Sequence, residues 1–97
     1  SVNELEVKMI MNSKEVTISG TGNGPIDSFV NGLSKELGIN IKISDYHQST
    51  ISSGSDAQAA AYIELEKDGQ TRWGVGINPN TTRASFEAII VGLSKIL

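Results

Sequence analysis

The stretch TISGTGNGP, residues 17–25, passes from an alternating apolar pattern through three glycines to a proline. The stretch RWGVGINP, residues 72–79, has the same character about fifty residues later. Each stretch precedes a helical pattern, and the two helical patterns end on nearly one hexapeptide, GLSKEL at 32–37 and GLSKIL at 92–97. The sequence therefore predicts a small domain built from two copies of one unit, with a seam between the copies that can hold a ligand.

Alternation of apolar and polar residues predicts five strands. The short turn 12–14 joins the first two strands into a hairpin, and Asp68-Gly69 is a dipeptide that favours the turn of a second hairpin. Residues 52–56, SSGSD, have the composition of a flexible turn. The expected strands are 3–11, 15–21, 39–44, 57–65 and 73–77, and the expected helices are 25–37 and about 81–97.

Both helices have a clear apolar face. Pro25 suits the first turn of the first helix, because the N–H that proline lacks has no partner there. Gly38 ends this helix, whose apolar stripe consists of Ile26, Phe29, Val30, Leu33 and Leu37. The second helix is apolar over a wider stripe than one sheet face needs, so we expect part of it to meet a partner chain.

These elements predict an α+β fold: two pseudo-symmetric ββ(β)α units forming an antiparallel sheet with both helices packed on one face. Residues 1–97 fit a single regulatory or dimerisation domain. The second unit has three strands before its helix and the first has two, so we expect a further strand upstream of Ser1. Because the chain begins with serine and no signal peptide is visible, we interpret it as a fragment of a longer protein.

Composition excludes several classes of function. The net charge of −3 and the scattered basic residues argue against nucleic acid as a partner. Apolar runs fall short of the roughly 20 residues that a membrane span needs, so no membrane partner is expected. The chain has no cysteine, which suits a reducing cytoplasm and excludes thiolate chemistry.

The sequence offers no catalytic or metal-binding constellation. His47 is the only histidine, and a metal site would lack ligands. Asp45, His47 and a serine could be drawn as a triad, but no nucleophile elbow supports it, and a hydrogen-bonded or solvated histidine is the better interpretation. The glycine spacing at 20–24 differs from the dinucleotide fingerprint. We therefore expect no cofactor, no metal and no catalysis on this fragment.

Two features point to a small zwitterion instead. The backbone N–H groups of residues 22–26, at a helix N-terminus, suit a carboxylate, although a plain strand-to-helix turn explains the glycines equally well. Alanines at 57 and 59–61 have small side chains and leave space beside the strand. This space can hold a ligand side chain between Ile26, Ile43 and Tyr46, or it can simply allow a helix to pack closely. Asp56 or Asn23 can accept from an ammonium group.

The chain resembles, over nearly its whole length, the C-terminal regulatory domain of 2-isopropylmalate synthase. Five strings carry the resemblance: GTGNGPI at 20–26, Asp45-Tyr46, GSDAQAAAY at 54–62, WGVGI at 73–77 and Ala84-Ser85. The resemblance implies two βββα units, a homodimer, and leucine as a feedback inhibitor bound near the dimer interface. It also implies a catalytic barrel elsewhere in the same chain, which would condense acetyl-CoA with 3-methyl-2-oxobutanoate. The residues that the resemblance assigns to the effector are Gly22, Asn23, Gly24, Pro25, Ile26, Ile43, Tyr46, Thr50, Asp56, Ala57 and Ala59.

Two other functions stay open at this stage. A citramalate-synthase regulatory domain would sense isoleucine, and one shifted methyl group changes binding by only about 1–3 kcal/mol in an apolar pocket. The strings at 54–62 and 73–77 favour leucine. A purely structural dimerisation domain would bind no amino acid and would keep its interface when pocket residues are changed.

Overall fold

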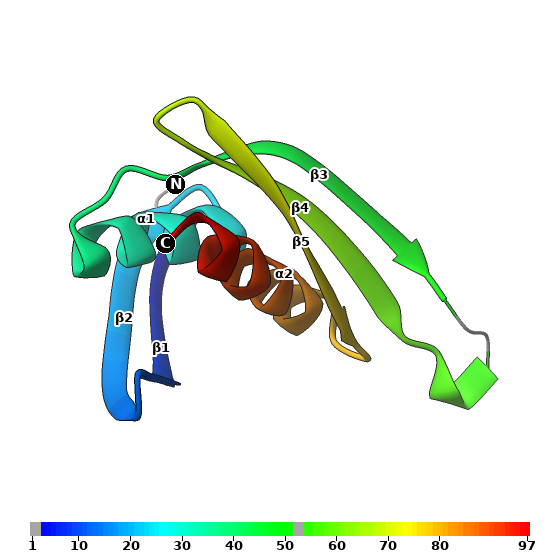
Figure 1. The fold of residues 1–97 in the computed structure, drawn as a ribbon. Coiled ribbons are helices and arrows are strands. Elements are labelled where there is room, and N and C mark those ends of the chain that lie inside the picture. Colours follow the sequence, from blue (N-terminus) through cyan, green and yellow to red (C-terminus); the bar gives the residue numbers. More distant parts are fainter. Residues whose placement is uncertain (1–2, 52–53) are drawn as a thin grey trace. The chain divides into compact units, whose positions relative to one another are not determined.

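The computed structural model describes residues 3–51 and 54–97 of the chain. The chain forms two compact units, Ser1–Asn40 and Ile41–Leu97, called unit 1 and unit 2 below. Figure 1 shows unit 1 in blue to blue-green and unit 2 in green to red. Each unit consists of an antiparallel sheet followed by one long helix.

Unit 1 is a hairpin with a helix packed on it. Strands β1 (Asn3–Met11) and β2 (Lys14–Gly22) pair antiparallel along their whole length, and α1 (Pro25–Leu37) packs mainly against β2. Asn12 and Ser13 form the turn with φ angles of 52° and 65°, so both have the left-handed conformation of a type I′ hairpin turn.

Unit 2 has one strand more. Its elements are β3 (Lys42–Thr50), the short 3₁₀ helix η1 (Gly54–Asp56), β4 (Ala59–Lys67), β5 (Gln70–Asn78) and α2 (Thr81–Ile96). The strands are ordered β3-β4-β5 and both pairings are antiparallel. The β4–β5 turn is Asp68-Gly69, with φ angles of 52° and 82°, as the dipeptide predicts. Helix α2 lies along one face of this sheet (Figure 1).

The helix ends follow their sequence signals. Helix α1 begins at Pro25 and ends at Gly38, whose φ of 66° is the left-handed C-cap conformation that glycine adopts at little cost. Asn80 caps α2, because its side-chain oxygen accepts a hydrogen bond of 2.9 Å from the Arg83 N–H. Neither α1 nor α2, the helices of the described part of the chain, is long and apolar enough to cross a membrane.

Strand glycines let the helices approach the sheets closely in both units. A Cβ atom at Gly20 would overlap the Ser28 carbonyl oxygen and lie 2.7 Å from the Gly32 nitrogen. A Cβ atom at Gly74 would meet Ala88 and Gly92 in the same way. Gly20 and Gly74 therefore occupy equivalent places in their units. The helix residues that they contact, Ser28 and Gly32 in one unit and Ala88 and Gly92 in the other, are also equivalent. This correspondence confirms the predicted repeat.

Each unit has an apolar core between its helix and its sheet. In unit 1 the core consists of Ile18, Phe29, Val30 and Leu33. In unit 2 the core consists chiefly of Ile63, Leu65, Ala84, Ala88, Ile89 and Leu93. The small residues of α2 belong to this core because a helix can only pack close to glycines if its own contact residues are short.

The predicted α+β class and the two pseudo-symmetric units are confirmed, and within the described residues the strands pair in two sheets, one in each unit. The strand predicted at 39–44 is wrong in its limits, because β3 runs from Lys42 to Thr50. Pairing with β4 extends the strand beyond the apolar alternation that defined the prediction. Of the predicted turn 52–56, Gly54–Asp56 form one 3₁₀ turn, and residues 52–53 lie outside the described residues.

Candidate functional site

The eleven predicted effector residues fall into two sets. Unit 1 contains Gly22, Asn23, Gly24, Pro25 and Ile26. Unit 2 contains Ile43, Tyr46, Thr50, Asp56, Ala57 and Ala59. The first set follows the end of β2, and the second set lies along β3, η1 and the start of β4.

The first set forms the turn from β2 into α1. Gly24 is the N-cap residue with extended backbone, and it offers no side chain to the N–H groups of the first helical turn. Pro25 contributes no N–H of its own, so the N-terminus of α1 leaves backbone donors without a side-chain cap. The positive end of the helix dipole points at the same place, and this environment attracts an anion.

A carboxylate already lies at this turn. Asp27, in the first turn of α1, accepts a hydrogen bond from the Asn23 N–H at 3.4 Å. That distance is long for an N–H···O contact, so the interaction is weak. The turn is therefore chemically suited to a carboxylate, and an arriving carboxylate would compete with Asp27 for the Asn23 donor.

A β-bulge in β3 determines which residues of the second set lie on the same face of the sheet. Ile43 lies opposite Leu65 and Tyr46 lies opposite Ile63, so three residues of β3 span the same distance as two of β4. The bulge falls at Ser44, whose hydroxyl donates to the Glu64 side chain at 2.8 Å. In a regular strand Ile43 and Tyr46, which are three residues apart, would point to opposite faces, because successive side chains alternate; the bulge puts them on the same face.

As a result, four predicted residues share the sheet face that carries α2. Ile43 and Tyr46 are half-buried there, and Thr50 pairs with Ala59 at the far end of β3. Ala59 is only 7% exposed. Asp56 and Ala57 lie between β3 and β4: Asp56 is exposed, and the Ala57 N–H donates to the Gly54 carbonyl oxygen at 3.2 Å.

The sequence analysis gave two explanations for the alanines of β4, close packing of a helix and space for a ligand. Ala61 is fully buried and lies opposite Gly76, one of the two β5 glycines at which the backbone of α2 comes close to the strand. Its small side chain is thus explained by helix packing alone. Ala59 lies two pairs further along the strand, beside exposed Thr50, and is not opposite a glycine, so the close approach of α2 does not by itself explain its small side chain.

Tyr46 takes part in a hydrogen-bond chain that the sequence analysis did not predict. Its hydroxyl lies 3.0 Å from the Ser85 hydroxyl of α2 and donates to Gln48 Oε1 at 3.3 Å. Ser85 is fully buried and donates to the Thr81 carbonyl oxygen at 3.1 Å. A signal for Ser85 exists in the sequence: it is a polar residue within the apolar stripe of α2, and a buried hydroxyl needs partners.

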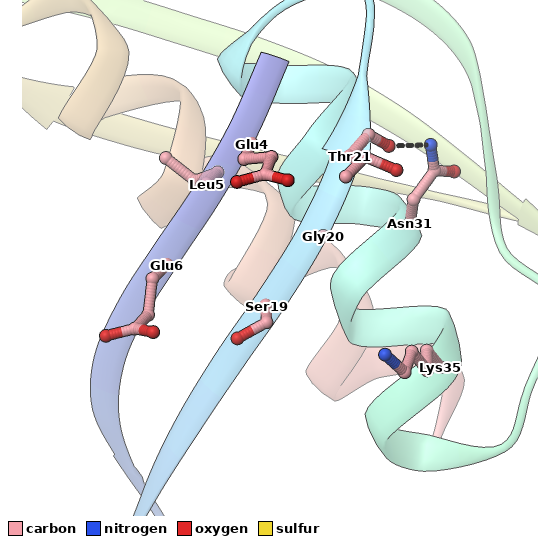
Figure 2. A pocket seen from close by; sticks show the side chains of 8 residues that line it. All are labelled: Glu4, Leu5, Glu6, Ser19, Gly20, Thr21, Asn31 and Lys35. Atoms are coloured by element: carbon pink, nitrogen blue, oxygen red, sulfur yellow. Dashed lines mark hydrogen bonds between the residues drawn. The ribbon is translucent and has the colours of Figure 1, made fainter. Parts of the chain in front are cut away.

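A cavity of about 580 Å³ lies elsewhere in unit 1 and is shown in Figure 2. It is lined by Glu4, Leu5, Glu6, Ser19, Gly20, Thr21, Asn31 and Lys35. The Asn31 amide joins α1 to β2 by donating to the Thr21 carbonyl oxygen at 2.8 Å. None of the predicted effector residues lines the cavity, and Leu5 is the one large apolar residue among those that line it, so a branched apolar side chain has few apolar side chains to pack on there.

His47 lies on the sheet face opposite α2. Its Nε2 atom is 3.3 Å from Asp45 Oδ2, and its ring stacks on Trp73 with centroids 6.0 Å apart. The imidazole is 66% exposed, so the predicted hydrogen-bonded or solvated histidine is confirmed. Within residues 3–51 and 54–97, no group of three or more His, Cys, Asp or Glu side chains is placed to hold a metal ion.

Comparison with known proteins gives the family. The family model described as the LeuA allosteric (dimerisation) domain matches residues 1–97. The 2-isopropylmalate synthase of Mesorhizobium japonicum is 42% identical over 93 residues, which are 96% of this chain and 17% of that protein. The 2-isopropylmalate synthase of Kineococcus radiotolerans is 43% identical over 93 residues, which are 96% of this chain and 16% of that protein.

A third relative, the 2-isopropylmalate synthase of Corynebacterium glutamicum (strain ATCC 13032), is 42% identical over 93 residues, which are 96% of this chain and 15% of that protein. The chain thus spans about one sixth of the length of the curated relatives it matches. Because the family match covers every residue, the chain belongs to the LeuA allosteric (dimerisation) domain family, the regulatory domain of 2-isopropylmalate synthases.

Proposed function

We propose that this regulatory domain binds leucine, and that leucine binding lowers the activity of a catalytic barrel carried by the same polypeptide in the cytoplasm. The relatives are named 2-isopropylmalate synthase, and the matched family is described as allosteric. On this proposal the chain performs no chemistry itself. It senses the end product of the pathway that the parent enzyme serves.

The observation that carries the proposal is the alignment that the bulge at Ser44 produces. Ile43, Tyr46 and Ala59 share one face, on which Ile43 lies two β4 residues from Tyr46 and Ala59 lies four further along β4. Such a surface matches a zwitterion with a branched apolar side chain, since polar groups fix its orientation and apolar groups supply affinity. Asp56 or Asn23 then accepts from the ammonium group, as the sequence predicts.

The turn at 22–26, described within unit 1 alone, also suits the carboxylate of an amino acid. Its uncapped N–H groups and the dipole of α1 suit the leucine carboxylate. Binding there replaces the 3.4 Å contact between Asn23 and Asp27, which is too long to compete strongly. We propose that all eleven predicted residues contribute to binding.

The domain acts as a homodimer on this proposal, in keeping with the dimerisation function named in the family description. The broad apolar stripe of α2 supports it, since Val91 and Leu97 remain 38% and 65% exposed. Leucine regulates by binding one arrangement of the dimer more tightly than another. Couplings of this kind are typically about 1–3 kcal/mol.

Isothermal titration with leucine, with isoleucine and valine as controls, tests the proposal. Saturable binding with preference for leucine is the expected result. Preference for isoleucine would instead identify an isoleucine sensor. No binding of any of the three to a folded dimer would reject the sensor and leave a structural dimerisation domain.

A further inference from the structure

Asparagine followed by glycine occurs twice in this chain, at Asn23-Gly24 and at Asn31-Gly32. This dipeptide is chemically labile, because the backbone nitrogen of a glycine has little steric protection and can attack the carbonyl carbon of the preceding side-chain amide. Both asparagines are exposed to solvent, so exposure does not distinguish the two sites. The backbone around each glycine does distinguish them.

The Gly24 nitrogen lies outside both neighbouring elements. Strand β2 ends at Gly22 and α1 begins at Pro25, so the Gly24 N–H belongs to neither hydrogen-bond ladder. The Gly24 backbone is extended, with φ of −173° and ψ of 178°, and a Cβ atom placed on it would meet nothing within 4 Å. These features allow the local rotation that brings the Gly24 nitrogen onto the Asn23 side chain.

The second site is held by the helix. Gly32 lies within α1, where each N–H donates to the carbonyl group four residues earlier. Gly32 is buried, and a Cβ atom there would lie 2.7 Å from the Ile18 side chain. The Asn31 amide is engaged as well, since it donates to the Thr21 carbonyl oxygen at 2.8 Å (Figure 2). Attack by the Gly32 nitrogen therefore requires that the helix open first.

We propose that Asn23 is a site of spontaneous deamidation, and that the negative charge it gains weakens leucine binding at the turn 22–26. The Gly24 nitrogen loses its proton to water and bonds to the Asn23 side-chain carbonyl carbon, from which ammonia leaves. Water then opens the resulting succinimide ring to aspartate or isoaspartate. The net change is one water consumed and one ammonia released, with no oxidation or reduction. The effect on leucine rests on the proposed function, whereas the modification itself does not.

The electrostatics of the turn change when the amide becomes a carboxylate. Asp27 already brings one negative charge to the turn, and its contact with the Asn23 N–H is long, at 3.4 Å. The uncapped N–H groups of α1 and the helix dipole stabilise a further negative charge, so they favour the deamidated product. The new carboxylate is part of the chain and stays in this environment. An arriving leucine carboxylate is then repelled by it.

Incubation of the folded chain at neutral pH in water enriched in heavy oxygen measures the modification, because each deamidation incorporates labelled oxygen. Both asparagines lie between Lys14 and Lys35, so trypsin releases them in one peptide and fragmentation locates the label. We expect label at Asn23 and more than about a hundredfold less at Asn31, where the helix must open first. In the urea-unfolded chain both sites should react at similar rates. Equal labelling of the two sites in the folded chain, or no label at Asn23, would overturn the inference.

Gly24→Ala tests the role of the glycine nitrogen. The added methyl group has room and the extended backbone suits alanine, so the variant keeps its fold while the methyl group hinders the attack. We expect most of the label at Asn23 to be lost. Circular dichroism establishes that the variant is folded, and full labelling of Asn23 in the folded variant would contradict the succinimide route.

Asn23→Asp carries the charge of the product and tests the effect on the effector. We expect leucine to bind this variant about tenfold more weakly than the wild-type chain. Asn40→Asp makes the same charge change at an exposed position after α1 and should leave the affinity unchanged. An unchanged affinity in Asn23→Asp, or an equal loss in Asn40→Asp, overturns the effect on leucine, while label at Asn23 still establishes the modification site. Absence of leucine binding to the wild-type chain rejects the proposed function and leaves the labelling result standing.

Discussion

Gly74 of β5 lies against the carbonyl group of Ala88 in α2, so closely that a Cβ atom on the glycine would overlap the carbonyl oxygen. The same relationship joins Gly20 of β2 to Ser28 of α1. In both units the helix therefore contacts the backbone of the strand directly at these glycines. Any added atom at these glycines must move the helix backbone, which is stiff because its hydrogen bonds hold it.

Gly74→Ala should destabilise the domain by about 3 kcal/mol, the upper part of the range for overpacked sites, since the overlapping atoms are backbone. Urea unfolding followed by the fluorescence of Trp73, the only tryptophan, measures the change. Gly24→Ala is the matched control, because a Cβ atom there has no neighbour within 4 Å and the backbone is extended. Equal unfolding midpoints for the two variants would contradict the close approach.

Ser13→Gly should stabilise the domain by about 0.5–1 kcal/mol. Ser13 has a φ of 65° in the β1–β2 turn, a conformation that costs a serine energy and glycine almost none. The β4–β5 turn has a glycine, Gly69, at the equivalent place. Thermal unfolding should show a rise of a few degrees for Ser13→Gly. The same change at Ser55, where the backbone has no positive φ, should give no rise.

The turns and helix ends were predictable because a few residues decide them locally. Asp68-Gly69 specifies its hairpin turn, and Pro25 and Gly38 mark the ends of α1. The repeat was predictable for a similar reason. In both units a helix packs closely on a strand, so small residues such as Gly32 and Gly92 stand at equivalent positions of the two helices.

The bulge at Ser44 and the true extent of β3 could not be predicted in this way. Both depend on pairing with β4, about twenty residues away, and serine is common in ordinary strands and turns. For the same reason the alternation rule gave no cause for Ile43 and Tyr46 to share a face. The contact of Tyr46 with Ser85 joins residues 39 positions apart, so only the folded unit brings it about.

Lys95→Met should weaken unit 2 and expose a sheet edge. The Lys95 ammonium donates to the Trp73 carbonyl oxygen at 2.6 Å, on the edge strand β5. Loss of this hydrogen bond should cost about 1 kcal/mol, since the lysine is exposed. An uncapped edge also favours pairing between chains, so light scattering should reveal more self-association in the variant.

Lys67→Met serves as the control for the lost charge. Lys67 pairs with exposed Asp68, at 3.2 Å, and such surface ion pairs contribute little. If Lys67→Met and Lys95→Met unfold at the same urea concentration and scatter light equally, the Trp73 contact has no particular role at the edge.

Tyr46→Phe should reduce leucine affinity about fivefold while leaving the unit folded, because it removes one hydrogen-bonding oxygen and keeps the ring that packs on the sheet. Asn23→Ala should weaken leucine binding by a similar factor, since it removes an exposed polar side chain from the turn at 22–26. Tyr62→Phe is the control for both, since Tyr62 lies on the opposite sheet face and its phenol is exposed. Calorimetric titration with leucine compares the three variants, and unfolding curves check their stability. Leucine affinities that match the wild type in both Tyr46→Phe and Asn23→Ala would mean that the effector binds elsewhere on the domain.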